Sequence, residues 1–459
     1  MSYSFRRFGP LNFYREALSI ALPVMLQQLI MSMVSLIDNF MVAGLGDTSM
    51  AAVNVSNQIF FVFIVMVNIL CQAGGIYLAQ FKGSGDSAGM RNAYRFKILI
   101  TLAAAALVFV LFWVIPEGLV SMLTMGNSSQ KEIVSKGALY IKLISFTLGP
   151  MVISSAIGTS FREIGRPAVP LVISAAATVI NTTGNWILIY GNLGAPRMEI
   201  SGAAIATIIA RCCETAAYLV YVNRKKINFY SPFRRLLEVD WSLVRKILSK
   251  SVMMFISEIS WVSSETVMVA LYNGRGGAET VAGMAAGWTI ANIFMLLFSG
   301  IWTTAAVLVG GSLGAGKLEE ARKRGAWIQS GSFVAGIFIA VVGIVISLLI
   351  VPLVFANLTP AARRIAIGLI TAILCYFPIW ALLNAQFAIC RSGGDTLMGL
   401  YAEGFVNFGG VIPGAFLLAI FTSIGPVGMF VILKLTDFIK YFIARYFYNK
   451  ERWVKNLTV

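Results

Sequence analysis

One acidic residue lies within an apolar stretch of the chain. Asp38 belongs to SLIDNFMVAG, in a segment of apolar and lightly polar residues that runs from residue 17 to residue 44. An ionised Asp at the centre of a membrane helix costs about 2.5 to 3.5 kcal/mol on insertion scales, so such acids usually bind an ion, a proton or an opposite charge. The sequence therefore makes Asp38 a candidate ion or proton site. The alternative is a carboxylate neutralised by nearby amides and hydroxyls for packing alone.

Other polar residues recur at helical spacing in further apolar segments. Asn181 and Asn185 are four apart and share one helical face, which favours lining of a cavity over packing. Glu258 and Glu265 are seven apart and also share a face. They are candidates to line a substrate cavity and attract a cation, unless one of them lies at an interfacial end. Glu403 is a third candidate acid of this kind.

A polar stripe follows the second apolar segment. Asn54, Gln58, Asn68 and Gln72 recur close to whole helical turns. Such a stripe either faces a water-filled cavity or forms hydrogen bonds between helices. Both interpretations stay open, and Asn54 and Gln58 are candidates for the substrate cavity.

The residue types exclude several kinds of chemistry. The chain has no histidine, which excludes Ser-His-Asp catalysis, Cys-His catalysis and histidine metal sites. Its five cysteines lie in apolar segments without the spacing of metal ligands. We therefore expect a protein that is not an enzyme and that has no cofactor.

The composition indicates an integral membrane protein. Of 459 residues, 58% are hydrophobic and 12% are charged, and the mean hydropathy is +0.81. Long apolar runs reach the roughly 20 residues that a helix needs to cross the hydrocarbon core. Twelve such spans are predicted, at residues 17–44, 50–80, 97–115, 133–160, 166–191, 201–223, 243–273, 279–313, 326–353, 362–390, 394–422 and 424–448. The predicted fold class is an all-α integral membrane protein.

The net charge of +16 is distributed unevenly along the chain. Most Lys and Arg residues fall on one side of a twelve-helix count, in segments such as NRKKINFYSPFRR and KYFIARYFYNKERWVK. By the positive-inside rule, this distribution predicts that both termini are cytoplasmic. It favours contact with the lipid bilayer over binding of nucleic acid.

The chain contains an internal repeat. KGSGDSAGMR at 82–91 aligns with LGAGKLEEAR at 313–322, SLIDNFMVA aligns with SSETVMVAL so that Asp38 falls on Glu265, and FREIG at 161–165 aligns with CRSGG at 390–394. Three matches in the same order predict two six-span lobes, 12–232 and 233–459, joined by a basic segment at about 223–250. Because six is even, the lobes share an orientation, as in some secondary transporters.

With these motifs in order, the sequence resembles the multidrug and toxic compound extrusion (MATE) family. ALPVMLQQLIMSMVSLIDNFMVAGLGDTSMAAVNVSNQI is similar to the family's first helical hairpin. FREIGRPAVPLVISAAATVINTTGNWILIYG and ISGAAIATIIA resemble its fourth loop, fifth span and entry to the sixth, and RSGGDT extends the likeness to nearly the whole chain. The resemblance implies a V-shaped bundle of twelve helices in two pseudo-symmetric lobes, in the plasma membrane of a prokaryote.

The resemblance also implies a cation site in the N-terminal lobe. The family places there an Asp on the first span, an Asn and an acid one turn apart on the fifth, and a Thr on the sixth. These positions are Asp38, Asn181, Asn185 and Thr207 here. Because Asn185 replaces the second acid, the site has one charge. That suits a proton carried by Asp38, while Na⁺ at Asp38, Asn181 and Thr207 stays possible.

Two further expectations come from the family. Its Na⁺-coupled branch has a C-terminal site with a Glu on the seventh span and a Tyr and an Asp on the tenth. Glu258 and Tyr376 match two of these positions, but Trp380 replaces the Asp. Family members bend the first span near a proline, so Pro23 is the candidate hinge.

The predicted function is secondary active antiport. The chain would export amphipathic or cationic organic compounds in exchange for H⁺ or Na⁺, by alternating access, with Asp38 as the coupling site. The alternative is an exporter or flippase of a lipidic or lipid-linked metabolite, for which Arg211 and Lys142 are candidate basic residues. The expected partners are a small organic substrate and the lipid bilayer, and a monomer suffices.

Overall fold

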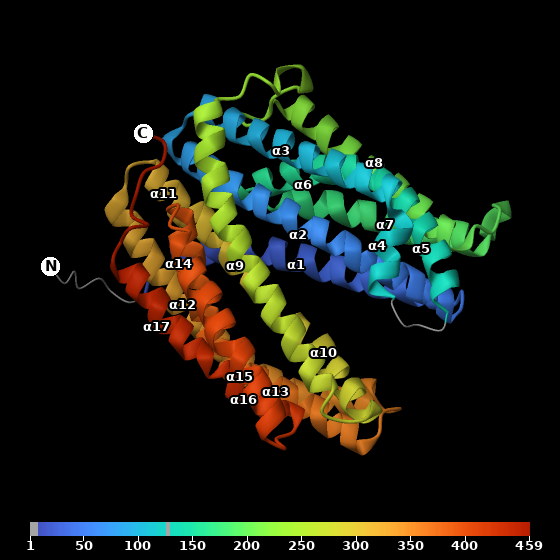
Figure 1. Cartoon of the computed structure of the whole chain (residues 1–459). Coiled ribbons are helices and arrows are strands. Elements are labelled where there is room, and N and C mark those ends of the chain that lie inside the picture. Colours follow the sequence, from blue (N-terminus) through green and yellow to red (C-terminus); the bar gives the residue numbers. More distant parts are fainter. Residues whose placement is uncertain (1–7, 125–128) are drawn as a thin grey trace. The chain divides into compact units, whose positions relative to one another are not determined.

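The computed structural model describes residues 8–124 and 129–459, which form helices joined by non-helical connections (Figure 1). No strand occurs within them, so the predicted all-α fold class is confirmed. The first part of the chain forms α1 (Leu11–Ala43), α2 (Asp47–Ser84), α3 (Ser87–Val114), α4 (Pro116–Leu123), α5 (Gln130–Ile144), α6 (Leu148–Glu163), α7 (Ala168–Tyr190) and α8 (Glu199–Lys225).

The second part of the chain has the same character. It forms α9 (Trp241–Asn273), α10 (Ala278–Ala305), α11 (Gly311–Gly314), α12 (Leu318–Val354), α13 (Pro360–Ser392), α14 (Leu397–Gly399), α15 (Ile412–Phe421), α16 (Pro426–Lys434) and α17 (Thr436–Asn449). Short 3₁₀ turns and π-helical segments connect some of them: η1 (Ser145–Thr147), η2 (Asn192–Gly194), η3 (Phe233–Arg235), η4 (Ala306–Gly310), η5 (Leu400–Phe405) and η6 (Asn407–Val411).

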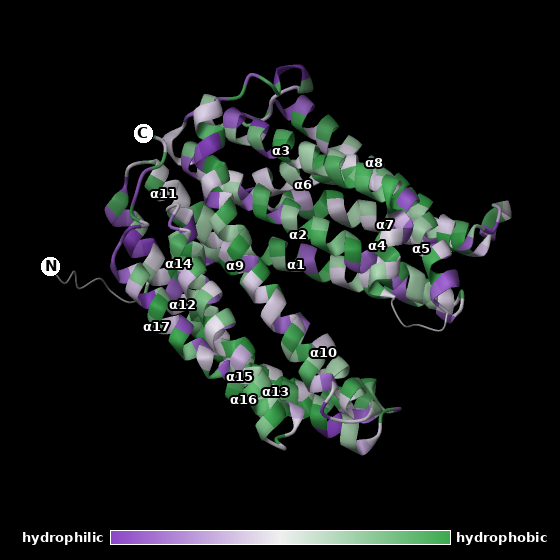
Figure 2. Ribbon diagram, in the orientation of Figure 1, coloured by the Kyte–Doolittle hydropathy of each residue, from purple (hydrophilic) through white to green (hydrophobic). Residues whose placement is uncertain are grey.

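Eleven segments among the described residues are long and apolar enough to cross a membrane. Figure 2 shows that hydrophobic residues make up most of the long helices, while hydrophilic residues are frequent at helix ends and in connections. The twelfth expected span, 424–448, corresponds to α16 and α17, which meet at Leu435 and are each too short to span alone. The chain is therefore a multi-pass membrane protein.

The turns of the internal repeat have matching backbone geometry. The paired glycines Gly85 and Gly316 have φ of +75° and +73°, and Gly165 and Gly394 have φ of +79° and +77°. This left-handed conformation is favourable for glycine because it has no Cβ. The backbone N–H of the residue after each glycine donates a hydrogen bond to the carbonyl five residues earlier, at the end of the helix. These bonds run from Asp86 to the Phe81 carbonyl (3.0 Å), Lys317 to Ser312 (3.0 Å), Arg166 to Phe161 (2.9 Å) and Asp395 to Cys390 (3.0 Å).

The helices pack into two compact units. The N-terminal unit contains Leu26–Lys82 and Asp86–Leu248; the C-terminal unit contains the described residues up to Met25, Gly83–Gly85 and Ser249–Val459. The division between the units falls inside α1, two residues after Pro23. In the N-terminal unit α7 packs along α8 and α3 along α6, and in the C-terminal unit α13 packs along α10 and α12. The predicted lobes 12–232 and 233–459 stay a prediction.

Candidate functional site

Helices α1, α7 and α8 bring the four predicted coupling residues together in two pairs. The Asn185 Nδ2 donates a hydrogen bond to Asp38 Oδ1 over 2.7 Å. One turn earlier on α7, the Asn181 Nδ2 donates to Thr207 Oγ1 over 3.2 Å. Asn181 and Asn185 are buried, while Asp38 and Thr207 are half-buried. The sequence thus places a single carboxylate beside a row of amide and hydroxyl groups.

Small residues allow α7 and α8 to approach closely at this site. Gly184 precedes Asn185, and a Cβ on Gly184 would lie 3.1 Å from the Cβ of Ala206, the residue before Thr207. Close approach at small residues is the usual basis of helix packing in membranes. The Gly184 and Ala206 pair therefore sets the separation at which Asn181 reaches Thr207.

The Asn185 side chain has an acceptor without a partner. Its Oδ1 is buried and accepts no hydrogen bond from the described residues. Buried polar atoms in native structures are nearly always satisfied, so an orphan next to a carboxylate suggests a missing donor or cation. A carboxylate and an amide oxygen are suitable ligands for a hard monovalent cation, and the carboxylate alone suffices for a proton. Among the described residues, no group of three or more Cys, Asp or Glu side chains is placed to hold a metal ion.

A second polar network in the N-terminal unit was missed from the sequence. Gln27 Nε2 donates to Ser174 Oγ over 2.9 Å, and Ser174 Oγ donates to Glu214 Oε1 over 2.9 Å. Arg211 completes it with a 2.8 Å ion pair to Glu214. Glu214 is buried. Its spacing of three from Arg211 was the only signal in the sequence, whereas its contact with Ser174 depends on the packing of α7 against α8.

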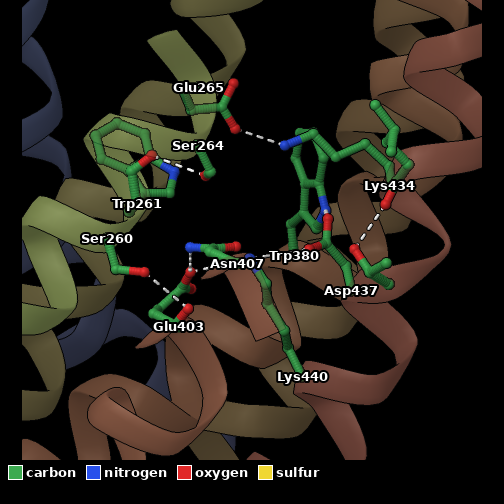
Figure 3. Close-up of polar contacts among 12 residues, drawn as sticks. Ser260, Trp261, Ser264, Glu265, Trp380, Glu403, Asn407, Lys434, Asp437 and Lys440 are labelled. Carbon is green, nitrogen blue, oxygen red and sulfur yellow. Dashed lines mark hydrogen bonds and ion pairs between the residues drawn. The ribbon is translucent and has the colours of Figure 1, made fainter. Parts of the chain in front are cut away.

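The three acids predicted to line a substrate cavity all have internal cationic partners. Arg391 lies 3.3 Å from Glu258, Lys434 lies 2.6 Å from Glu265 and Lys440 lies 2.9 Å from Glu403. The last two pairs are drawn in Figure 3. The guanidinium carbon of Arg391 also lies 4.7 Å from the centre of the Trp302 ring. The structure therefore adds three basic side chains, within or next to predicted spans, that sequence reasoning did not connect to these acids.

Trp380, which replaces the family's Asp, contacts a carboxylate from another helix. Its Nε1 donates to Asp437 Oδ2 over 2.8 Å (Figure 3). Asp437 also lies 3.3 Å from Lys440, and both residues are buried. The Tyr376 hydroxyl donates to the backbone carbonyl of Val431 over 2.8 Å. The structure thus does not join Tyr376 to Glu258 by a hydrogen bond. Instead, α17 supplies the carboxylate that reaches the Trp380 indole.

Glu403 lies on a π-helical segment. η5 contains Glu403 and η6 begins with Asn407, whose Nδ2 donates to Glu403 Oε2 over 2.9 Å. The backbone carbonyl of Glu403 accepts a hydrogen bond from Ser260 over 3.0 Å. π-Helical turns frequently occur at functional sites. Here the turn combines with Lys440 to fix the orientation of the Glu403 carboxylate.

The remaining predicted residues, on α1 and α2, take no part in the contacts described above. Asn54 is half-buried and Gln58 is exposed, both on α2. Pro23 lies inside the continuous helix α1 and is half-buried. Their assignments to a substrate cavity and to a hinge stay predictions.

Comparison with protein families places this geometry in a known group. The family model described as MatE matches the chain twice, over residues 23–187 and 253–417. The chain belongs to the MatE family. The two matches correspond to the two copies of the internal repeat, and together they contain Asp38, Asn181, Asn185, Glu258, Glu265, Tyr376 and Glu403.

Relatives of this MATE chain include bacterial proteins named for multidrug resistance. A "probable multidrug resistance protein NorM" of Thermotoga maritima is 23% identical over 97% of this chain and 94% of its own length. The protein of the same name from Rhizobium meliloti is 22% identical over 68% of this chain, a match that spans 65% of that relative. A solved structure of a mutant Vibrio cholerae MATE transporter, VcmN, superposes with a TM-score of 0.84. It shares 17% sequence identity and covers 96% of this chain and 97% of its own. The fold is thus that of MATE transporters.

Proposed function

We propose that this protein is a secondary active antiporter of a prokaryotic plasma membrane. It exports cationic or amphipathic organic compounds in exchange for H⁺ or Na⁺. The names of the NorM relatives support the substrate class. The observation that carries the coupling proposal is the Asp38 and Asn185 pair, in which a carboxylate on a membrane-spanning helix lies beside a buried amide whose oxygen has no partner among the described residues. No catalytic reaction, resident cofactor or protein partner is proposed, and a monomer suffices.

Asp38 is the group that takes up the ion in this mechanism. Asn185 holds the Asp38 carboxylate with one hydrogen bond. A proton would bind to Asp38 itself. Na⁺ would use the Asp38 carboxylate and the Asn185 Oδ1, with Asn181 one turn away on α7 and its hydrogen-bond partner Thr207 on α8. Either ion neutralises the one charge of the site, and the two charge states then favour different conformations.

Binding of the ion must be transmitted to a helix that can move. Asp38 lies on α1, the same helix that contains Pro23, and the packing units divide two residues after that proline. We propose that ion uptake at Asp38 changes the bend of α1 at Pro23 and releases substrate outward. Rocking of the lobes then resets the site. A tenfold ion gradient supplies about 1.4 kcal/mol, and each net charge moved through 100 mV adds about 2.3 kcal/mol.

The test is efflux of ethidium from proteoliposomes, with a pH gradient and a Na⁺ gradient imposed separately. Wild type should respond to one gradient, and Asp38→Asn should abolish the response because the site can no longer change charge. Glu117→Gln is the matched control, since Glu117 is an exposed acid in the same unit. Unchanged efflux in an inserted and folded Asp38→Asn protein would exclude Asp38 as the coupling site.

The alternative substrate is a lipidic or lipid-linked metabolite. The observation in its favour is the presence of Arg391, Lys434 and Lys440 at partly or fully buried positions of the C-terminal unit, where a phosphate group would find cations. If ethidium is not transported under either gradient while a lipid-linked sugar binds, this function replaces multidrug efflux. Dye efflux without binding of such lipids excludes it.

A further inference from the structure

A groove with a volume of about 640 Å³ lies on the C-terminal unit, and none of the acids described above is among its lining residues. Its walls come from α14 and η5 on one side and from α17 on the other, which pack against each other. The lining is apolar and largely aromatic, except for Lys450 and Arg452 just beyond the end of α17. The groove therefore has an apolar body and a basic end.

The aromatic rings form a continuous wall that leads to the basic end. Centroid distances are 5.3 Å for Phe405 and Tyr401, 5.5 Å for Tyr401 and Phe447, and 5.8 Å for Phe447 and Tyr446. The Lys450 ammonium then lies 4.3 Å from the centre of the Tyr446 ring. The wall is open to its surroundings, because Phe405 is 65% exposed and Tyr446 is 55% exposed. In a membrane-spanning chain these surfaces are available to lipid.

The two basic side chains are not neutralised by the protein. Lys450 and Arg452 are exposed, and neither makes a salt bridge within the part of the chain that the structure describes. The charge of Arg452 acts on the Asp395 carboxylate. That carboxylate also accepts backbone hydrogen bonds, and the charge of Lys250 acts on it as well. The basic end therefore has a net positive charge.

The chain around Arg452 is held in place. The next residue, Trp453, is 1% exposed and its Nε1 donates to the Tyr448 carbonyl over 3.0 Å. Its ring also stacks on Tyr448 at 5.3 Å. A buried anchor directly after Arg452 keeps the guanidinium beside the groove.

We propose that this groove is a binding site for an anionic phospholipid. An acyl chain lies along the rings of Phe405, Tyr401 and Phe447, and the headgroup phosphate contacts Lys450 and Arg452. An anionic headgroup is favoured over a zwitterionic one because the latter brings its own ammonium to a site that already has two uncompensated cations. The proposal is independent of the transported substrate and of Asp38.

The test uses the full-length protein in detergent, supplied with phosphatidylglycerol or phosphatidylcholine that have identical acyl chains. Native mass spectrometry measures the lipid retained by each sample. Wild type should retain phosphatidylglycerol in excess. Lys450→Gln with Arg452→Gln should reduce this excess on the order of thirtyfold, since the two cations each contribute about 1 kcal/mol near an anionic surface. The matched control is Arg224→Gln with Lys225→Gln, two exposed basic residues at the end of α8.

A second measurement locates the lipid in the wild-type protein. Phosphatidylglycerol with a photoreactive diazirine in its acyl chain should form adducts mainly within residues 397–405 and 442–447. Equal retention of both lipids by wild type would overturn the proposal. So would an equal loss in both double variants, or adducts spread evenly over the lipid-facing helices. Binding of a second copy of the chain at this face, seen as a dimer without lipid adducts there, would also overturn it.

Discussion

At the scale of single residues, Asn185 orients the Asp38 carboxylate by a direct hydrogen bond. Its Nδ2 fixes one carboxylate oxygen at 2.7 Å, and its own Oδ1 is left without a partner among the described residues. An amide cannot be ionised, so the site has one charge where a second acid would give it two. The residue type at position 185 therefore sets how many positive charges the site holds at neutrality.

Asn185→Asp should change the ion preference of the site. Two carboxylates at this separation repel each other unless a cation or a proton lies between them. We expect the variant to bind Na⁺ roughly tenfold more tightly than wild type. This corresponds to about 1.4 kcal/mol, the free energy of a shift of one pKa unit. The measurement is the melting midpoint in NaCl compared with KCl. Asn223→Asp, at an exposed position of α8, is the control. An equal Na⁺ effect in wild type and Asn185→Asp would contradict the idea.

At the scale of helices, α3 and α6 are joined by a buried ion pair. Lys97 is fully buried and contacts the largely buried Glu163, with Thr159 and Ser160 also bonded to the ammonium. Gly75 on α2 makes room for this pair, because a Cβ there would collide with the Glu163 carboxylate. Three helices are therefore fitted around one pair of charges.

Removal of one partner should be far more costly than removal of both. Lys97→Met leaves the Glu163 carboxylate buried without its cation, which costs about 3–5 kcal/mol in comparable cases. Lys97→Met with Glu163→Leu removes both charges and should recover most of the loss. Thermal unfolding of the purified variants in one detergent compares them. If the double variant melted no higher than the single variant, the ion pair would not be the cause.

Helix α1 should depend on Pro23 for movement rather than for folding. Replacement by Ala restores a backbone hydrogen bond and stiffens the helix, because proline lacks the N–H and clashes with the preceding turn. We expect Pro23→Ala to fold and to bind substrate, while its efflux rate falls several-fold. Pro378→Ala, inside α13, is the control for a proline in another long helix. Normal efflux by Pro23→Ala would make the proline a static kink.

The sequence was sufficient for the elements and for the acids, but not for the partners of the acids. Long apolar runs and matched glycines depend on nearby residues, so the spans and the repeat could be predicted. Asp38 was identified as an acid in an apolar span and Asn185 by its spacing from Asn181, and the family pattern assigned them to one site. The pairs of Glu265 with Lys434 and of Trp380 with Asp437 join residues 169 and 57 positions apart. Only the packing of α9 and α13 against α16 and α17 brings them together, and no short-range spacing reports it.

At the scale of the whole molecule, the basic segments should lie on one side of the membrane. In a cysteine-free background, a cysteine replacing Arg234 should react with a membrane-impermeant maleimide only after cells are permeabilised. A cysteine replacing Lys131 should react in intact cells. The reason is that positively charged loops stay in the cytoplasm. Both positions are exposed, so access through the protein does not limit labelling. The reverse pattern would invert the predicted topology.

The internal cations of the C-terminal unit have a consequence for every compound that enters it. Lys434 and Arg391 are covalently attached to the chain, so each faces its Glu at an effective concentration that free cations reach only in the millimolar range or above. A cationic drug would have to displace a tethered competitor before it could contact Glu265 or Glu258. Aromatic surface and shape, rather than charge, are therefore left to discriminate among compounds at these positions. This intramolecular competition reduces what the positive charge of a ligand could contribute to its binding there.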